Sequence, residues 1–352
     1  MKKIFQIAVV LLLLSLMAGC ASFKVGMYNY AISGARSKAG LKPCFVNIDG
    51  QTLAYLERPG SGETIVLIHG FGANKDNWIR FVRYLPPEYR VIAFDMSGHG
   101  DSSKLNDKTY SIDFMTSSFA QAANALGLSK FHIAGSSMGG NIALLYTAQN
   151  PQRVVSMCLL DTGGLSAVNP QPSDLQLAVA KGQSPPTPTS KKEFSELMKY
   201  AFYKEPVIPW PITSVMAEKA VEASAFNQKI WRDINAHPTD IVPLLPGLHL
   251  PVLVIWGDKD RILHVSTTEV LKRSLPDAET IIMKDCGHVP MLERPQETAE
   301  YYAAFLNIYR DCDAMRMVSN DKKVAIHKIY MDLRLLKKYA QEARVLGSGS
   351  WV

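Results

Sequence analysis

The chain of 352 residues is poor in cysteine, with five in all, and only 20% of its residues are charged. Five cysteines are too few for a scaffold held together by disulfides, and a hydrophobic content of 47% excludes a disordered chain. The sequence lacks a Gly-X-Y repeat, which excludes a collagen-like fibre. It also lacks a nucleic-acid reader motif, so no nucleic-acid partner is expected. We therefore expect a globular protein, with either two units or one large core that carries an insertion.

The N-terminus carries a short apolar run over residues 4–17, which follows Lys2 and Lys3 and leads through small residues to Cys20. This run is shorter than the ~20 residues that a membrane-spanning helix needs, and the pattern is typical of a secretory signal peptide. The last five residues of the segment, Leu-Met-Ala-Gly-Cys, resemble a bacterial lipobox. We predict a lipoprotein-type signal peptide over residues 1–19.

This resemblance implies that Cys20 becomes a lipidated N-terminus that holds the protein on a membrane. With Ala21 and Ser22 after the cysteine, the sequence resembles lipoproteins of the outer membrane. We therefore expect the body of the protein to lie outside the cytoplasm, in a bacterial cell envelope. Ordinary secretion and an uncleaved N-terminal anchor are the two alternatives.

The four other cysteines show no metal-binding spacing, so no metal site is expected among them. One of them, Cys158, lies in an apolar, strand-like run and is expected to be a small buried side chain. An envelope location permits disulfides, and we expect at most one bridge. The four residues are Cys44, Cys158, Cys286 and Cys312.

Beyond residue 43, short runs rich in β-branched residues alternate with longer segments of helical character. Continuous apolar runs suit strands that are covered on both faces, and their alternation with helices is typical of a mostly parallel sheet. The first two runs lie close enough to form a hairpin. Eight strands are predicted, over residues 45–49, 52–57, 64–69, 90–95, 131–135, 154–161, 251–257 and 279–284.

The alternation is interrupted once, by a proline-rich stretch over residues 163–248. An unstructured loop of that length is unusual in a compact domain, so we predict a helical cap with helices near 191–202 and 214–235. A closing helix is expected over 295–309. The predicted order is a tether over 20–43, the first part of the core over 44–162, the cap, the second part of the core over 249–312, and a tail over 313–352.

The tail carries eight basic and four acidic residues. Its apolar residues repeat at spacings of three and four, which is typical of one face of an amphipathic helix, and its other face is basic. Two interpretations are open: the helix packs on the protein's own surface, or it lies on a membrane or a partner. The apolar positions are Ile326, Ile329, Leu333, Leu336, Ala340 and Ala343.

Residues 135–139, Gly-Ser-Ser-Met-Gly, follow a predicted strand and precede a helical run. Glycines two before and two after the central serine allow the chain to turn tightly from strand to helix. This turn leaves Ser137 exposed beside a helix N-terminus, which favours negative charge. The pattern predicts that Ser137 is a nucleophile.

A serine hydroxyl needs a base to remove its proton, and of the eight histidines only His288 stands just beyond the final predicted strand. The base in turn needs a carboxylate to orient it. Asp260 follows the preceding predicted strand and is placed for this role, with Asp161 as the alternative acid. The order Ser, Asp, His along the chain is that of the α/β-hydrolases.

Acyl transfer also needs backbone donors for the oxyanion. The N–H of Met138, the residue after the nucleophile, is one predicted donor. The other is the N–H of Phe71, in the glycine-containing loop His-Gly-Phe-Gly over residues 69–72. The position of this loop after the third predicted strand favours the assignment.

Together with the loop Asp-Met-Ser-Gly-His-Gly-Asp-Ser over 95–102, these motifs resemble serine hydrolases of the α/β-hydrolase fold, over about residues 44 to 310. Residues 73–78 and the serine turn are similar to those of monoacylglycerol lipases and bacterial family V lipases. The resemblance implies an eight-stranded, mostly parallel sheet with helices on both faces and a helical cap. It implies no cofactor and no metal, and a structural role for His99.

The resemblance also implies hydrolysis of small-molecule or lipid esters through an acyl-enzyme, as in a lipase or an esterase. A carbon–carbon bond hydrolase and an acyltransferase of the same fold are the enzyme alternatives. A catalytically silent binding lipoprotein is the non-enzyme alternative. The acyl chain is expected under the cap, against the aromatic residues Phe194, Phe202, Trp210, Phe226 and Trp231.

Overall fold

The computed structural model describes residues 21–165, 171–183 and 186–314. The predicted signal peptide, Cys20 and the amphipathic helix expected near 326–343 lie outside these ranges. Within them, no helix combines the length and the apolarity that a bilayer crossing requires.

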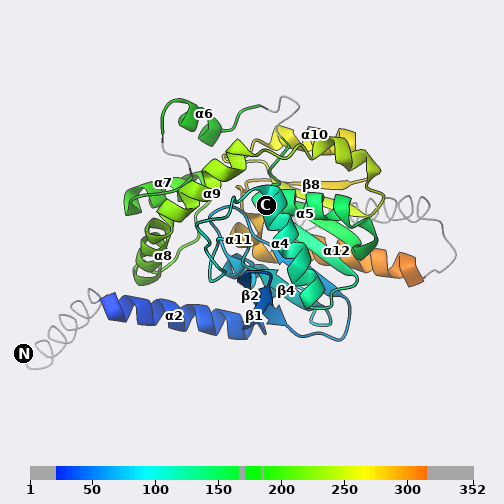
Figure 1. Ribbon diagram of the computed structural model, residues 1–352, viewed down its shortest axis with the longest axis horizontal. Coiled ribbons are helices and arrows are strands. Elements are labelled where there is room, and N and C mark those ends of the chain that lie inside the picture. The colour runs from blue at the N-terminus through cyan, green and yellow to red at the C-terminus, as the bar shows by residue number, and fades with distance from the viewer. Residues whose placement is uncertain (1–20, 166–170, 184–185, 315–352) are drawn as a thin grey trace, which may run out of the picture.

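An eight-stranded sheet forms the centre of the molecule (Figure 1). Its strands are β1 (Lys42–Ile48), β2 (Gln51–Arg58), β3 (Thr64–Ile68), β4 (Arg90–Phe94), β5 (Phe131–Ser136), β6 (Val154–Leu160), β7 (Val252–Gly257) and β8 (Glu279–Met283). They lie in the order β1-β2-β4-β3-β5-β6-β7-β8. Strand β2 pairs antiparallel with β1 and β4, and every other pair is parallel. The predicted fold class, an α/β-hydrolase sheet of eight mostly parallel strands, is confirmed.

Helices pack on both faces of this sheet, and further helices form a cap beside it. They are α2 (Ala21–Lys38), α3 (Ile79–Val82), α4 (Ile112–Ala125), α5 (Met138–Gln149), α6 (Asp174–Ala180), α7 (Lys191–Ala201), α8 (Trp210–Glu222), α9 (Ser224–Ala236), α10 (Thr268–Ser274), α11 (Pro290–Glu293) and α12 (Pro295–Ala314). Because successive side chains of a strand point to opposite faces, Val66 of β3 packs with α4 and α5, whereas its neighbour Leu67 packs with α3 and α12. Because both faces of such a strand are buried, its side chains are apolar at successive positions.

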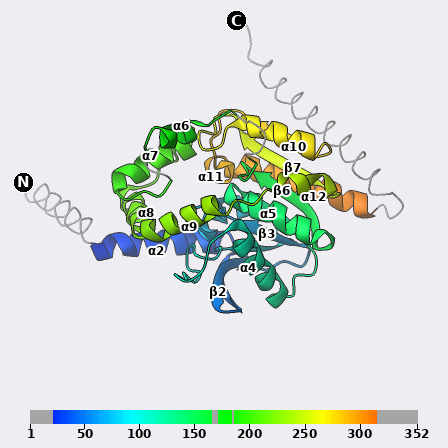
Figure 2. The same cartoon turned by 45° about the horizontal axis from the view of Figure 1, so that its top comes forward.

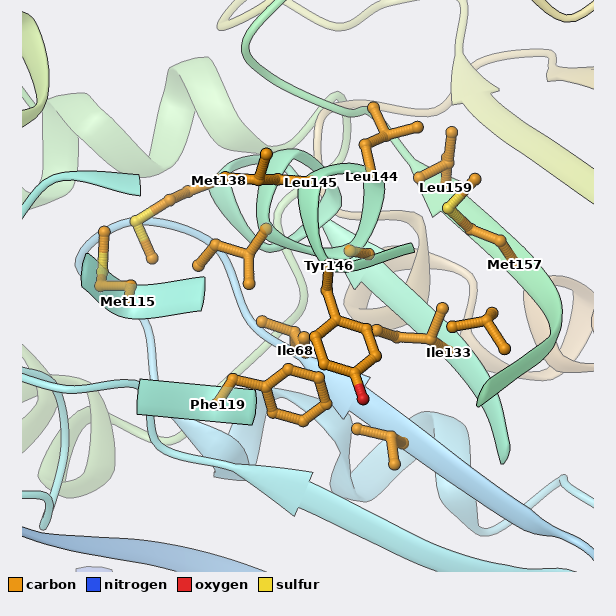
Figure 3. Packing of buried hydrophobic residues seen from close by; sticks show 14 of the residues in the cluster. Ile68, Met115, Phe119, Ile133, Met138, Leu144, Leu145, Tyr146, Met157 and Leu159 are labelled. Carbon is orange, nitrogen blue, oxygen red and sulfur yellow. The ribbon is translucent and has the colours of Figure 1, made fainter. Parts of the chain in front are cut away.

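On the face of the sheet that α4 and α5 cover, the core fixes helix α5, which follows the predicted nucleophile. Figure 3 shows Tyr146 of α5 packed against Phe119 of α4, with 4.8 Å between the ring centres. Phe131 of β5 packs against both rings, at 5.7 and 6.1 Å. This aromatic cluster holds the helix against the sheet, and so it holds the turn between β5 and α5.

The cap consists of α6 to α9, inserted between β6 and β7, and Figure 2 shows these helices as an arc at one side of the sheet. The helix expected over 214–235 is wrong as one element, because the chain forms α8 and α9 with a break at Ala223. The Ser224 hydroxyl donates to the carbonyl of Thr187, which fixes the start of α9 against the entry of the cap.

The segment expected as a tether forms the 18-residue helix α2, which the sequence did not predict. Arg36 near its end donates two hydrogen bonds to the carboxylate of Asp76 in the core, both at 2.7 Å. Lys24 near its start pairs with Glu218 of α8 at 3.0 Å. Helix α2 therefore joins the core to the cap, and Figure 2 shows it beside α8.

Candidate active site

Ser137 stands at the sharp turn between β5 and α5. Its φ of 53° and ψ of −118° are strained for a residue with a side chain. A Cβ on Gly135 would lie 2.2 Å from the carbonyl oxygen of Gly139, and a Cβ on Gly139 would lie 2.2 Å from that of Ile68. Only glycine fits at both positions, so the spacing of the motif follows from the closeness of strand and helix.

The structure brings His288 and Asp260 together from the loops after β8 and β7. The Nδ1–H of His288 donates to Oδ2 of Asp260 at 2.7 Å, and both side chains are buried. The other oxygen of Asp260 accepts the N–H groups of Ile262 and Leu263, at 2.8 and 2.9 Å. These bonds fix the carboxylate, and they select the histidine tautomer whose Nε2 is free to accept a proton.

Ser137 and His288 line the same cavity, and the predicted oxyanion loop lies beside the serine. A Cβ on Gly70 would be 3.1 Å from the Cβ of Ser137 and 3.7 Å from its Oγ. Phe71 follows Gly70, and its ring contacts Trp231 of the cap at 5.3 Å. Met138 is the first residue of α5, a position where the backbone N–H has no carbonyl partner within the helix.

Two buried histidines, His69 and His99, lie at the predicted oxyanion loop. His69 donates from Nδ1 to the carbonyl of Gly70 at 2.7 Å and accepts the N–H of Met96 at Nε2. Burial lowers the pKa of His69 to about 4 and that of His99 to about 3. Both rings are therefore uncharged at neutral pH, which agrees with the structural role expected for His99.

A buried ion-pair network, which the sequence did not predict, holds the chain that follows the predicted oxyanion loop. Lys75 donates from its backbone N–H to Oδ1 of Asp95 at 2.7 Å and from Nζ to Oδ2. Its Nζ also donates to Asp101 at 2.6 Å. Burial opposes the charge of Lys75, but the two carboxylates outweigh it and raise the pKa of Lys75. The signal in the sequence is Asp95 at the end of a buried strand, where a carboxylate needs a cation.

A second group that sequence reasoning missed joins the cap to the histidine loop. The carboxylate of Glu293 in α11 accepts three backbone N–H groups: those of Tyr203 and Lys204 after α7, at 3.1 and 2.8 Å, and that of Gly287, at 2.9 Å. The N–H of His288 donates to the carbonyl of Ala201 at 2.8 Å. The end of α7 and the loop that carries His288 are thus held together.

The cavity above Ser137 measures about 2230 Å³. The five cap aromatics expected to face the acyl chain, Phe194, Phe202, Trp210, Phe226 and Trp231, all line it. Helix α2 contributes Tyr28 and Ile32 to the wall, which was not foreseen. An apolar cavity of this size has room for a ligand with a long hydrocarbon chain.

Asp161, the alternative acid, lies at the end of β6 and does not hydrogen-bond to His288, among the contacts of the described residues. One ligand-type atom each of Asp161, Asp260 and His288 lie within 4.8 Å of one another. Because Asp260 and His288 are hydrogen-bonded to each other, we interpret these two side chains as a proton relay and not as metal ligands. Cys44, Cys158 and Cys286 are free thiols, and Cys158 is buried as expected; the side chain of Cys312 lies outside the described part.

The chain is similar to known proteins over most of its length. The family model described as alpha/beta hydrolase fold matches residues 63–184 and 199–295. Lipase 3 of Moraxella sp. (strain TA144) is 34% identical over 297 residues, which cover 82% of this chain and 93% of that lipase. The human monoacylglycerol lipase ABHD6 is 29% identical over 276 residues, or 76% and 80% of the two chains.

A solved structure of a membrane phospholipase A, described as a novel bacterial virulence factor, superposes with a TM-score of 0.79. It is 39% identical, and the match covers 88% of this chain and 99% of the other. The residues that the family model matches include strands β3 to β8, the serine turn and most of the cap. The chain belongs to the alpha/beta hydrolase fold family, among the ester-hydrolysing serine hydrolases that include these lipases.

Proposed function

We propose that Ser137 attacks the carbonyl carbon of a carboxylic ester, with His288 as the base and Asp260 as the acid that orients it. Because the Nδ1–H of His288 is held by Asp260, Nε2 takes the serine proton. The observation that carries this proposal is the 2.7 Å bond between His288 and Asp260, in the cavity onto which the strained Ser137 turn opens.

The negative charge that forms on the carbonyl oxygen is held by the N–H groups of Phe71 and Met138. His288 then passes its proton to the leaving alcohol, and the acyl group stays on Ser137. Water, activated by the same histidine, releases the acid and restores the serine. A lipase or esterase reaction of this kind draws its nucleophile and its proton relay from the chain itself.

The apolar lining of the cavity favours lipid esters, including the monoacylglycerol type. We expect kcat/KM for aryl esters to rise with acyl length from two to about eight carbons, by up to about fourfold per buried CH₂ group, the equivalent of ~0.8 kcal/mol. Initial rates across chains of two to sixteen carbons, beside monoacylglycerols, measure this.

The same panel contains the competing chemistry. A serine hydrolase involved in carbazole degradation matches this chain with a TM-score of 0.65 at 25% identity. A ring-fission diketone therefore belongs in the panel, and its preference over every ester would replace the lipase assignment by carbon–carbon bond hydrolysis. A best rate on the two-carbon ester would contradict the lipid class.

We further propose that residues 1–19 are removed as a signal peptide and that a lipid on Cys20 holds the enzyme on a membrane of a bacterial cell envelope, the outer membrane. The first described residue after Cys20 opens helix α2, which is fixed to core and cap, and one similar protein is described as a membrane phospholipase A. The basic tail over 313–352 is a second candidate for membrane contact.

Cys20→Ser is expected to abolish incorporation of a labelled fatty acid and to move the protein from the membrane to the soluble fraction. Cys44→Ser is the matched control and should be labelled like the wild type. Metabolic labelling followed by fractionation measures both. Unchanged labelling of the Cys20 variant would refute lipidation at this residue, and membrane retention without label would indicate an uncleaved anchor.

A further inference from the structure

A second buried carboxyl group lies beside the proposed triad. Asp161 is fully buried at the end of β6, and its φ of 44° is in the left-handed region, which is costly for a residue other than glycine. Its backbone N–H donates to the carbonyl of Ile255 at 3.1 Å. Its Oδ1 accepts the N–H of Gly257 at 2.9 Å. The chain thus fixes this carboxyl at the site in spite of the strain.

The other carboxyl oxygen of Asp161, Oδ2, lacks a hydrogen-bond donor within the described part of the chain. Oδ2 is buried, and no N–H or O–H donor of the described residues hydrogen-bonds to it. An oxygen of Asp161 lies within 4.8 Å of both an Asp260 oxygen and a His288 ring nitrogen. Buried polar atoms without a partner are rare in folded proteins. A proton on Oδ2 would resolve this, because the protonated oxygen could donate a hydrogen bond to the carboxylate of Asp260.

The surroundings of Asp161 favour that proton. The ionisable groups that face it are Asp260 after β7, Cys286 and His288 in the loop after β8, and Glu293 of α11. Two of these are carboxylates, and two adjacent buried carboxyls do not both ionise readily. Burial, and then the charge of Asp260, raise the pKa of Asp161 well above its ordinary value.

We propose that Asp161 is a positioning residue for Asp260: its neutral carboxyl donates a hydrogen bond that holds the triad acid in place, and when Asp260 is replaced it ionises and becomes the partner of His288. In the second state the Asp161 proton passes to solvent, and the carboxylate accepts the Nδ1–H of His288. This inference rests on the proposed triad, and it explains why two strand ends carry an aspartate at one site.

Four proteins test it with an aryl ester as substrate: the wild type, Asp161→Asn, Asp260→Asn and the double variant. Asn at 161 keeps an oxygen for the N–H of Gly257 and an N–H donor for Asp260, so we expect kcat to stay within about threefold of the wild type. In Asp260→Asn, kcat should fall by about 10²–10³-fold, which is less than the ~10⁴-fold fall that is typical when a triad acid is replaced.

The double variant tests the reserve role of Asp161, which is to replace Asp260 as the partner of His288. If Asp161 replaces Asp260, the double variant loses a further tenfold or more (about 1.4 kcal/mol), far beyond the effect of Asp161→Asn alone. The kcat/KM of Asp260→Asn should also rise with pH more steeply than that of the double variant, because Asp161 must first lose its proton. Equal rates and equal pH profiles in these two proteins would overturn the reserve role.

Infrared spectroscopy tests the neutral carboxyl without reference to activity. The wild type at neutral pH should show the C=O stretch of a protonated carboxyl, and Asp161→Asn should lose it. Asp174→Asn is the matched control, since Asp174 is half-exposed and paired with Arg261, and should keep the band. Absence of an Asp161-dependent band would overturn the inference even in an active enzyme. Absence of Ser137-dependent turnover would instead remove the proposed function.

Discussion

Ser137→Ala should lower kcat for ester hydrolysis by about 10⁶-fold, to a rate close to that of the Ser137-independent background. In the proposed mechanism, the hydroxyl at the strained turn forms the acyl-enzyme, and alanine has no group that can replace it. The variant should also lose covalent labelling by a fluorophosphonate probe. The measurement is the rate of label incorporation, followed by identification of the labelled peptide.

The neighbouring serine provides the control. Ser136 is buried at the end of β5, and its Oγ has no hydrogen-bond partner among the described residues. Replacing it by Ala therefore removes no bond, and Ser136→Ala should still be labelled at Ser137. If the wild type and Ser137→Ala were labelled equally, or not at all, the hydrolase assignment would give way to the silent binding lipoprotein.

Lys75→Met should lower the free energy of unfolding by about 3–5 kcal/mol, because it leaves the buried carboxylate of Asp95 without its cation. Met keeps the length of the side chain, so the loss reports charge and not volume. Asp95 is fully buried, and two backbone N–H groups, of Lys75 and Asp101, then remain to it. Urea unfolding followed by circular dichroism measures the change.

Two comparisons separate this effect from a general loss of packing. Lys191→Met removes a half-exposed partner of Glu218 and should cost less than about 1 kcal/mol. The double variant Lys75→Met/Asp95→Asn should be more stable than Lys75→Met, since the unpaired carboxylate is gone. A single variant as stable as the Lys191 control would refute a buried charged pair.

The pH dependence of this destabilisation has a defined sign. Burial raises the pKa of Asp95, even beside Lys75, and loss of the cation raises it further. In Lys75→Met, Asp95 thus binds a proton in the folded state before it does so in the unfolded state, and folding is favoured by acid. The stability gap between the variant and the wild type should narrow as the pH falls towards the unfolded-state pKa.

Local patterns in the sequence were enough to predict much of this molecule. The eight strands lie within a few residues of their predicted ranges because a fully buried parallel strand, such as β5, must be apolar at every position. The serine turn was visible because two glycines at fixed spacing are a steric requirement of one short segment. Asp260 and His288 followed from their places after strands, since parallel strands end at one edge of the sheet.

The features that were not predicted depend on contacts between distant segments. Arg36 fixes helix α2 to Asp76, and Lys24 fixes it to Glu218. No pattern within the sequence of α2 indicates these partners. Likewise, the sequence favoured Asp260 over Asp161 as the acid, but it did not show that the two carboxyls lie side by side. Only the pairing of β6 with β7 brings the two carboxyls to one place. The break at Ala223 depends in the same way on the contact between Ser224 and Thr187.

The contacts of Glu293 also determine how this cap can move. One carboxylate holds the backbone that leaves α7 and the backbone that leads into His288. A movement of that end of the cap would therefore displace His288, the proposed base. A movement of the cap that leaves His288 in place would keep the end of α7 fixed and would have to break the pair between Lys24 of α2 and Glu218 of α8 at the far side. The end of α7 and the loop that carries the proposed base are therefore expected to move as one unit.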